Sequence, residues 1–310
     1  MPPVCYTICR IKFYGFSAAR FVSARPVNGN KMLKKFYKMH GIGNDYIYFD
    51  CMKEDISDPG ELSKRLSDRH FSIGGDGVIL LRPSAVADCK MSMFNTDGSE
   101  GKMCGNGIRC VGKLARDLGY VKGESCTVET LSGIKTLKFI LGSDGKVASV
   151  TVDMGGAILR GEDIPSTLCG ESIVSRPVNI AGGEWNVTLV SMGNPHCVVF
   201  ADPEKLDLEK IGPLFENSPL FPERVNTEFV RVMRRNELKM RVWERGSGET
   251  WACGTGACAA AVAAVLNGCA DMNAPITVHL RGGDLIITYT PDTVFMEGGA
   301  TLVFTGEIDI

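Results

Sequence analysis

The segment KMCGNGIRCVGKLARDLG, residues 102–119, decides the fold because its pattern returns once, as WACGTGACAAAVAAVLNG at residues 251–268. Both copies carry the tetrapeptide Cys-Gly-x-Gly, followed by residues that favour a helix. In the first copy, apolar residues recur at helical spacing until Gly119, and glycine commonly ends helices. In the second copy, residues 257–266 are apolar on every side, which is typical of a helix buried in a domain centre. We therefore predict two central helices, each beginning directly after a cysteine.

The repeat extends beyond these two segments with an offset of about 150 residues, which indicates duplicated domains rather than a solenoid. Three further pairs recur in the same order: Gly43-Asn44 with Gly193-Asn194, Asp76-Gly77 with Asn226-Thr227, and Gly98-Ser99 with Gly246-Ser247. Short β-type runs, such as CKMSMF and KVASVTVDM, surround the predicted helices and are separated by turn residues. We expect an α+β fold of two pseudo-symmetric domains, each a curved, mostly antiparallel sheet wrapped around a central helix.

The predicted domain boundaries follow from this repeat. Residues 32–150 would form the first half, with 299–310 returning to it, and residues 151–298 would form the second half. Residues 1–31 are set apart as an N-terminal extension, because they contain Lys and Arg but no acidic residue. They are either an organelle transit peptide or a stretch upstream of a true start at Met32, and we favour the second interpretation.

The composition excludes several classes of protein. With 44% hydrophobic residues, 23% charged residues and a net charge of -2, the 310 residues resemble an ordinary globular protein, and we expect no nucleic-acid partner. No apolar run reaches the roughly 18 to 20 residues that span a bilayer, so we expect no membrane partner. None of the twelve cysteines forms a Cys-x-x-Cys pair and only four histidines are present, so we expect no metal site. Most other thiols are predicted to be small buried residues in a reducing compartment: Cys51, Cys89, Cys126, Cys169 and Cys269.

Two cysteines at two helix starts can perform acid–base chemistry. A helix start carries unsatisfied N–H groups and a partial positive charge, which should lower the pKa of a cysteine placed there. Two such thiols facing one cleft favour one thiolate beside one thiol, because two close thiolates repel. A carbon held between them would lose a proton to one sulfur and regain one from the other on its opposite face. Burial alone does not predict matched cysteines on matched scaffolds, so we assign this chemistry to Cys104 and Cys253.

Several longer motifs carry a resemblance to a known family. They are KMHGIGNDY (38–46), DRHFSIGGDGVILL (68–81), FNTDGSEGKMCGNGIRC (94–110), SMGNPHCVVF (191–200), FPERVNTEF (221–229) and WERGSGETWACGTGACAAA (243–261). From Tyr37 to the C-terminus, the chain resembles the diaminopimelate epimerase family. The resemblance implies an isomerase that converts LL-2,6-diaminopimelate to the meso form, a step of lysine and peptidoglycan precursor synthesis. It further implies that no PLP or other cofactor is needed, that the protein is a homodimer, and that it is cytoplasmic, or plastidic if residues 1–31 are a transit peptide.

The resemblance also implies roles for individual residues. Cys104 and Cys253 would be the two bases, and the backbone N–H groups of Gly105-Asn106 and Gly254-Thr255 would hold the reacting carboxylate. The rest of the substrate would be bound by Asn44, Asn95, Asn194, Asn226, Glu244 and Arg245.

These side chains suit a zwitterionic amino-acid group, because Arg245 can bind a carboxylate through two hydrogen bonds and Glu244 can accept from an ammonium group. His196 and Glu244 would additionally tune the cysteine pair. Gly77 departs from those family members that carry a glutamine there, which puts that substrate contact in doubt.

Other interpretations of the same residues stay open. Asparagines are common in turns for backbone reasons, Glu244-Arg245 could be a solvated pair, and His196 could be a buried histidine. A racemase acting on proline or hydroxyproline would use the same chemistry but would leave Glu244-Arg245 without a group to hold. A thiol redox or metal-binding protein would use Cys104 and Cys253 as a disulfide or as ligands. The sequence does not indicate which cysteine is the resting thiolate.

Overall fold

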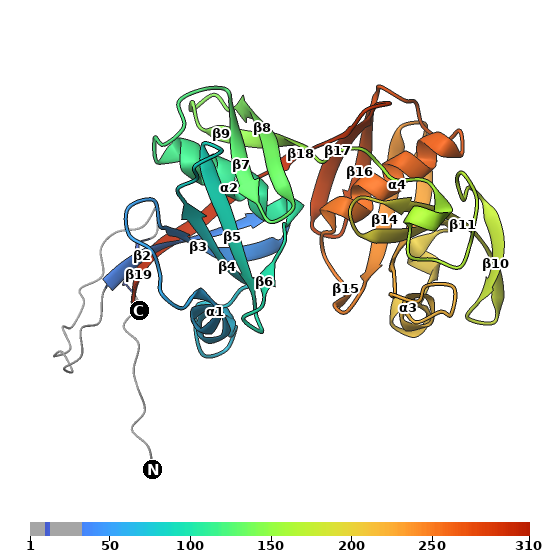
Figure 1. The fold of residues 1–310 in the computed structure, drawn as a ribbon, viewed down its shortest axis with the longest axis horizontal. Helices are drawn as coiled ribbons and strands as arrows, with labels where there is room; N and C mark the ends of the chain where they lie inside the picture. Colours follow the sequence, from blue (N-terminus) through green and yellow to red (C-terminus); the bar gives the residue numbers. More distant parts are fainter. Residues whose placement is uncertain (1–9, 13–32) are drawn as a thin grey trace, which may run out of the picture.

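The computed structural model describes residues 10–12 and 33–310 and contains two lobes of similar build (Figure 1). The first half contains β2 (Leu33–Gly41), β3 (Asn44–Asp50), α1 (Pro59–Ser67), β4 (Gly77–Arg82), β5 (Cys89–Asn95), β6 (Glu100–Gly101), α2 (Gly105–Asp117), β7 (Ser125–Thr130), β8 (Gly133–Leu141) and β9 (Val147–Asp153). The second half contains β11 (Gly183–Ser191), β12 (Pro195–Phe200), α3 (Leu208–Glu216), β13 (Asn226–Arg234), β14 (Glu237–Glu244), β15 (Gly248–Glu249), α4 (Gly254–Leu266), β16 (Pro275–Leu280), β17 (Gly283–Tyr289) and β18 (Val294–Gly299). The remaining elements are β1 (Arg10–Lys12), β10 (Arg176–Ile180), β19 (Thr301–Asp309) and the 3-10 turns η1 (Gly161–Asp163) and η2 (Pro203–Lys205). The strands and α-helices thus follow one another in the same order in both halves.

The strands pair mostly antiparallel, with two parallel pairings at matching places in each half. These are β3 with β4 and β5 with β7 in the first half, and β12 with β13 and β14 with β16 in the second. A parallel pairing requires a crossover, and α1, α2, α3 and α4 each lie in one of the four crossovers. In each lobe the curved sheet surrounds the second of its helices, α2 or α4 (Figure 1). The predicted α+β fold of curved, mostly antiparallel sheets around central helices is therefore confirmed.

The two central helices are buried as the sequence predicts. In α4 every residue from Ala257 to Ala264 is buried, so alanine fits where larger side chains would collide with the surrounding strands. The outer helices α1 and α3 are not predicted by the repeat analysis. A local signal for α1 exists, because the Asp58 side chain accepts a hydrogen bond from the Glu61 N–H and Pro59 occupies the first turn.

The pairing register corrects the sequence repeat by one residue. Ile47 pairs with Val78 in the first half, and its counterpart Cys197 pairs with Thr227 in the second. Gly77 therefore corresponds to Asn226, whereas the sequence repeat matches Asp76 to Asn226. Gly77 has φ +152°, and a Cβ there would lie 2.1 Å from the Phe94 carbonyl oxygen, so a glutamine side chain does not fit at this position.

The halves are joined through their sheets. β9 and β18, the last strands of the two halves, pair with each other antiparallel. The chain then crosses over, because β10 follows β9 but pairs with β11, and β19 follows β18 but pairs with β2. Each half is thus completed by a strand that follows the last strand of the other half. The exact domain boundaries stay a prediction.

Three further expectations from the sequence can be compared with the structure only in part. Both interpretations of residues 1–31 concern a segment that lies outside the described residues, apart from residues 10–12. These three residues form β1, whose backbone pairs with β19. Cys51, Cys89 and Cys126 are buried as predicted, but Cys169 is exposed and Cys269 is half-buried. Within residues 10–12 and 33–310, no helix has the length and apolar character to cross a bilayer, and no cluster of His, Cys, Asp and Glu could hold a metal ion.

Candidate active site

Cys104 and Cys253 occupy the same position at the two central helices. Each is the N-cap residue, with extended backbone angles of φ -130° and ψ 119° at Cys104 and φ -116° and ψ 106° at Cys253. Each sulfur accepts a hydrogen bond from the backbone N–H three residues later, Gly107 or Gly256, and both N···S distances are 3.4 Å. A thiol therefore takes the place that a Ser or Asp oxygen usually takes at a helix start. The prediction that both helices begin directly after a cysteine is confirmed.

The two helix starts lie against each other where the halves meet. The Asn106 amide donates to the Ala252 carbonyl oxygen at 3.1 Å, which links the first turn of α2 to the residue before Cys253. Met296 of β18 packs against both first turns, because a Cβ at Gly105 would lie 2.8 Å from its Cε and one at Gly254 3.0 Å from its Sδ. The two glycines thus let the Met296 side chain approach both first turns closely.

A buried arginine holds this junction. Arg109 has no exposed surface, and its guanidinium donates to Asn106 Oδ1 at 3.0 Å, to the Gly105 carbonyl at 3.0 Å and to the Gly299 carbonyl at 3.2 Å. These bonds fix the Asn106 amide with its nitrogen towards Ala252. The sequence analysis gave neither Asn106 nor Arg109 a role in joining the halves.

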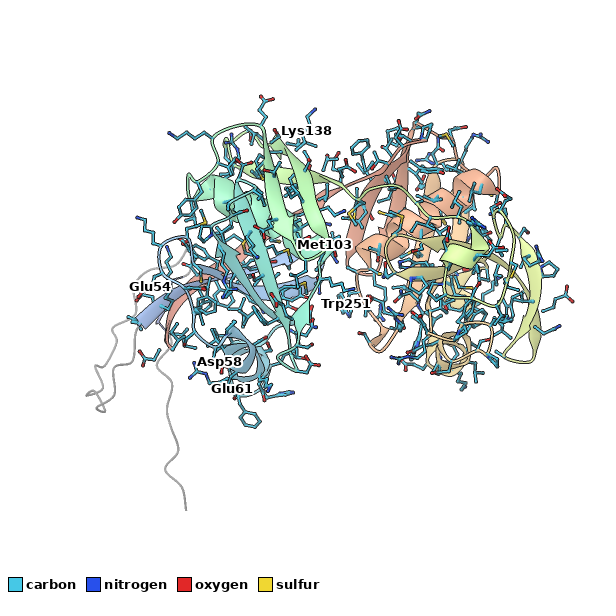
Figure 2. The ribbon with its side chains drawn as sticks, viewed as in Figure 1. Glu54, Asp58, Glu61, Met103, Lys138 and Trp251 are labelled. Atoms are coloured by element: carbon cyan, nitrogen blue, oxygen red, sulfur yellow. The ribbon has the colours of Figure 1, made fainter. Side chains whose placement is uncertain are left out.

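The residues that precede the two cysteines also lie at this junction. Figure 2 shows Met103 and Trp251 where the two lobes face each other. A Cβ at Gly43 of the first half would lie 3.5 Å from the Trp251 ring, and the Gly282 N–H donates to the Trp251 carbonyl at 2.9 Å. The cysteine motifs of both halves therefore approach one shared region.

The expected lowering of the two thiol pKa values is wrong. Burial raises the pKa of Cys104, although the N–H groups of Gly107 and Asn106 and the charge of Arg109 oppose the rise. Burial, followed by the charges of Glu244 and Glu228, raises the pKa of Cys253 well above its usual value. Desolvation outweighs the helix starts because a thiolate loses its water there. Burial therefore opposes ionisation of both sulfurs.

The first cysteine is surrounded by amide and apolar groups. The Cys104 thiol donates to Asn44 Oδ1 at 3.3 Å, and the Asn44 amide donates to Asp76 Oδ2 at 2.6 Å. Beneath the helix start, a Cβ at Gly107 would lie 2.7 Å from the Ile79 Cδ1 atom. Asn44 thus contacts the sulfur, and Asp76 orients the Asn44 amide.

The second cysteine is surrounded by polar and charged groups. The Thr255 hydroxyl lies 3.6 Å from the Cys253 sulfur and accepts from the Asn194 amide at 3.3 Å. His196 Nε2 lies 3.0 Å from Asn194 Oδ1, so Asn194 connects the histidine to this helix start. Burial raises the pKa of Glu244, and the Thr250 hydroxyl donates to its carboxylate. Thr250 was not singled out in the sequence.

The other expected binding residues are engaged in local bonds. The Asn226 amide donates to the Pro195 carbonyl at 2.8 Å and its Oδ1 accepts from the Arg245 N–H at 3.0 Å, so both ends of this side chain hold backbone. The Arg245 guanidinium donates to the Glu223 carbonyl at 2.9 Å. The Asn95 amide donates to the Ser99 hydroxyl at 3.0 Å. Asn95, the structural counterpart of Glu244, is half-buried at the end of β5.

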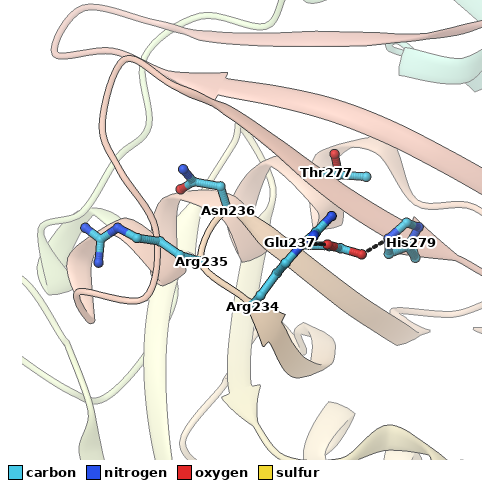
Figure 3. A pocket seen from close by; sticks show the side chains of 6 residues that line it. All are labelled: Arg234, Arg235, Asn236, Glu237, Thr277 and His279. Atoms are coloured by element: carbon cyan, nitrogen blue, oxygen red, sulfur yellow. Dashed lines mark hydrogen bonds and ion pairs between the residues drawn. The ribbon is translucent and has the colours of Figure 1, made fainter.

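A separate surface hollow is a weaker candidate for a ligand-binding site than the junction of the two helix starts. Figure 3 shows its lining residues, which are Arg234, Arg235, Asn236, Glu237, Thr277 and His279, around a volume of about 500 Å³. His279 pairs with Glu237 at 3.1 Å and Asp284 at 2.7 Å, and Arg235 pairs with Asp271. Because these cations already have acidic partners, the hollow offers no free charge to a ligand.

Comparisons by sequence find one family. A sequence model of diaminopimelate epimerase matches residues 36–159 and 188–303. A protein named diaminopimelate epimerase from Acetivibrio thermocellus is 54% identical over 279 residues, covering 89% of this chain and 99% of its own length. One of the same name from Methanococcus maripaludis strain S2 is 51% identical over 279 residues, covering 89% of this chain and 100% of its own length.

Solved structures of more distant proteins share the fold. A PhzF-family phenazine biosynthesis protein from Bacillus anthracis has a TM-score of 0.63 at 16% identity, covering 90% of this chain and 100% of that chain. A hydroxyproline epimerase from Agrobacterium vitis has a TM-score of 0.66 at 12% identity, covering 90% and 93%. At these identities the likeness concerns the fold alone.

Proposed function

The chain belongs to the diaminopimelate epimerase family and is an isomerase, and we propose that it interconverts LL- and meso-2,6-diaminopimelate by proton transfer at two cysteines. The observation that carries this proposal is the matched placement of Cys104 and Cys253 as N-caps of two helices whose first turns are hydrogen-bonded together. Matched donors from Gly107 and Gly256 give each sulfur the same stabilisation when it is charged.

In the proposed reaction one cysteine acts as thiolate and the other as thiol. The thiolate removes the α-proton and becomes a thiol, while the electron pair of the broken C–H bond is delocalised into the neighbouring carboxylate. The second thiol then gives its proton to the opposite face of the carbon and becomes a thiolate. The carbon is inverted, no proton is gained or lost overall, and the two sulfurs have exchanged states.

The substrate's reacting carboxylate would be bound at the two helix starts. The first-turn N–H groups of Gly105-Asn106 and Gly254-Thr255 have no carbonyl partner within their helices, and both helix dipoles favour an anion there. Negative charge grows on this carboxylate as the proton leaves, so these donors would stabilise the transition state more than the substrate.

The proposed distal pocket consists of Asn44, Asn95, Asn194, Asn226, Glu244 and Arg245. Asn44 and Asn194 supply amides one hydrogen bond away from the cysteine motifs. The Asn226 side chain accepts a hydrogen bond from the Arg245 backbone, and we propose that its role is to orient Arg245. The Arg245 guanidinium would then bind the distal carboxylate of the substrate. Glu244 would accept from an ammonium group of the substrate. A homodimer and a cytoplasmic location are expected from the family resemblance and stay predictions.

The proposal is tested by incubating the full-length protein with LL-diaminopimelate in deuterated water without added PLP or metal. We expect meso-diaminopimelate carrying deuterium at the inverted α-carbon, because the donating thiol exchanges its proton with solvent. Proline and glutamate serve as controls and should gain no deuterium. Exchange into proline instead would favour a proline racemase, and activity that is lost with a chelator would favour a metal enzyme.

A further inference from the structure

Glu228 is a fully buried carboxylate on β13 that the proposed reaction does not use. Its side chain and that of His196 on β12 have no exposed surface, and Glu228 Oε1 lies 2.7 Å from His196 Nδ1. Glu228 Oε2 is buried without any hydrogen-bond partner among the described residues. A buried carboxylate with one unpaired oxygen destabilises the folded protein, so we looked for a function that would explain its presence.

A continuous series of contacts runs from this carboxylate to a catalytic sulfur. His196 Nε2 lies 3.0 Å from Asn194 Oδ1, the Asn194 amide donates to the Thr255 hydroxyl at 3.3 Å, and that hydroxyl lies 3.6 Å from the Cys253 sulfur. An amide oxygen only accepts, so His196 Nε2 carries a hydrogen. The other ring nitrogen, Nδ1, lies 2.7 Å from Glu228 Oε1, so the imidazole ring is held between two partners.

The first half lacks this pair at the matching place. A Cβ at Gly256 would lie 2.7 Å from Glu228 Oε1, and a Cβ at the counterpart Gly107 would lie 2.7 Å from Ile79 Cδ1. The same slot beneath the helix start therefore holds a carboxylate in the second half and a methyl group in the first. Glycine at both positions leaves the slot open. Of the two helix starts, the one capped by Cys253 therefore packs on a buried carboxylate, and the one capped by Cys104 packs on an aliphatic side chain.

We propose that Glu228 is a positioning residue, which fixes His196 between two partners and, through Asn194 and Thr255, holds the Cys253 thiol ready to give and take a proton. This inference rests on the proposed function, because it assumes that Cys253 is one of the two acid–base groups. The titratable groups that face Glu228 are His196 and Cys197 on β12, Glu244 on β14 and Cys253 at the start of α4.

A change at Glu228 should act on one cysteine only. After burial, the charges of Glu244 and Glu228 are the main causes that raise the pKa of Cys253, whereas Glu244 is the acidic group that acts on Cys104. Glu228→Gln keeps the shape of the side chain but can no longer carry a charge or donate a carboxyl proton. The Cys253 thiol should then ionise more easily, while Cys104 stays as it is.

The experiment measures alkylation of both cysteines in the same sample of full-length protein, by iodoacetamide between about pH 7 and 10, with peptide mass spectrometry. In Glu228→Gln we expect Cys253 to react about threefold faster near pH 8, with Cys104 unchanged within about twofold. With diaminopimelate, kcat should fall about tenfold with KM changed less than about twofold. Ile79→Val, at the matching slot of the first half, is the control and should leave the Cys253 rate unchanged.

Each outcome decides the matter. Equal reactivity of Cys253 in Glu228→Gln and in the unchanged protein, or a parallel change at both cysteines, would overturn the proposal. If Glu228→Gln does not fold, His196→Asn replaces it, because this variant breaks the same series of contacts and should also change Cys253 alone. If neither variant folds, Glu228 is a structural residue and the proposal is wrong. Alkylation needs no substrate, so its result is independent of whether diaminopimelate is epimerised.

Discussion

The surroundings of Cys104 and Cys253 differ far more than the backbone that carries them. Both cysteines cap a central helix, and both sulfurs accept from an N–H at 3.4 Å. Around Cys104 lie the Asn44 amide and the apolar Ile79, whereas around Cys253 lie the Thr255 hydroxyl and the acidic Glu244 and Glu228. The duplication therefore kept the positions of the two sulfurs and changed what lies behind them.

This difference gives the two thiols unequal acidity. At Cys104 the Gly107 and Asn106 N–H groups, followed by the charge of Arg109, oppose the rise in pKa caused by burial. At Cys253 the charges of Glu244 and Glu228 add to that rise. The pKa of Cys253 is raised further, so Cys104 ionises first as the pH rises. The two thiols of the proposed symmetric pair are thus unequal.

The largest effect is expected from Cys104→Ala and Cys253→Ala. Each should lower the epimerisation rate by about 1,000-fold, because each removes one of the two proton-transfer groups. The matched controls are Cys110→Ala and Cys258→Ala, buried residues one to two turns further into the same helices, which should stay active. Steady-state rates with LL-diaminopimelate give the comparison. Near-normal turnover in either catalytic variant would mean that the halves do not share the reaction.

The next effect concerns the matched positions Gly77 and Asn226. Gly77→Ala should lower the free energy of unfolding by about 3 kcal/mol, because its Cβ would collide with the Phe94 carbonyl and its φ of +152° disfavours any side chain. Asn226→Ala should cost about 2 kcal/mol through two unpaired backbone groups. Urea unfolding followed by circular dichroism measures both. A loss below about 1 kcal/mol at Gly77 would show that the β4 backbone can relax there.

A smaller effect is expected where the two helix starts join. Asn106→Ala should lower the free energy of unfolding by about 2 kcal/mol, because it leaves the Ala252 carbonyl and one Arg109 N–H unpaired in a buried region. Its counterpart Thr255→Ala should cost less than about 1 kcal/mol, since Thr255 is half-exposed. Equal losses of unfolding free energy in the two variants would show that Asn106 and Thr255 contribute equally to stability.

The last prediction concerns the pH dependence of the reaction. Burial raises the pKa of both thiols, so the fraction that carries one thiolate is small at neutral pH and grows with pH. We expect kcat/KM to rise about tenfold per pH unit from about pH 7 towards the lower thiol pKa and then to level off. Initial rates in overlapping buffers at constant ionic strength test this. A flat profile would show that a thiolate is already present at neutral pH.

The sequence predicts the parts of this molecule that depend on local patterns. The Cys-Gly-x-Gly motifs and the residues after them predict both central helices, because capping and apolar periodicity act within a few residues. The repeated Gly-Asn pairs also mark the matching turns before β3 and β12, from which Asn44 contacts Cys104 and Asn194 contacts Thr255. The direction of the thiol pKa shifts was predicted incorrectly, because a helix start is visible in sequence whereas the depth of burial is not.

Contacts between distant strands are what the sequence does not predict. The Glu228–His196 pair depends on the parallel register of β12 and β13, and no local pattern specifies that register. The motif FPERVNTEF contains Glu228, yet it reads as an ordinary strand there. Arg109 likewise looks like a polar residue of an amphipathic helix, and its burial follows only from the packing of the second half against α2.

The crossing of β10 and β19 between the halves restricts how this chain can be divided. A single cut between β9 and β10 would give a first fragment without β19, which leaves β2 as a bare strand edge. The second fragment would keep β19 with no strand to pair with, and the β9–β18 edge would be bare in both. Exposed edges of this kind recruit other chains and lead to aggregation. The two halves, although alike, are therefore expected to be soluble only when made together.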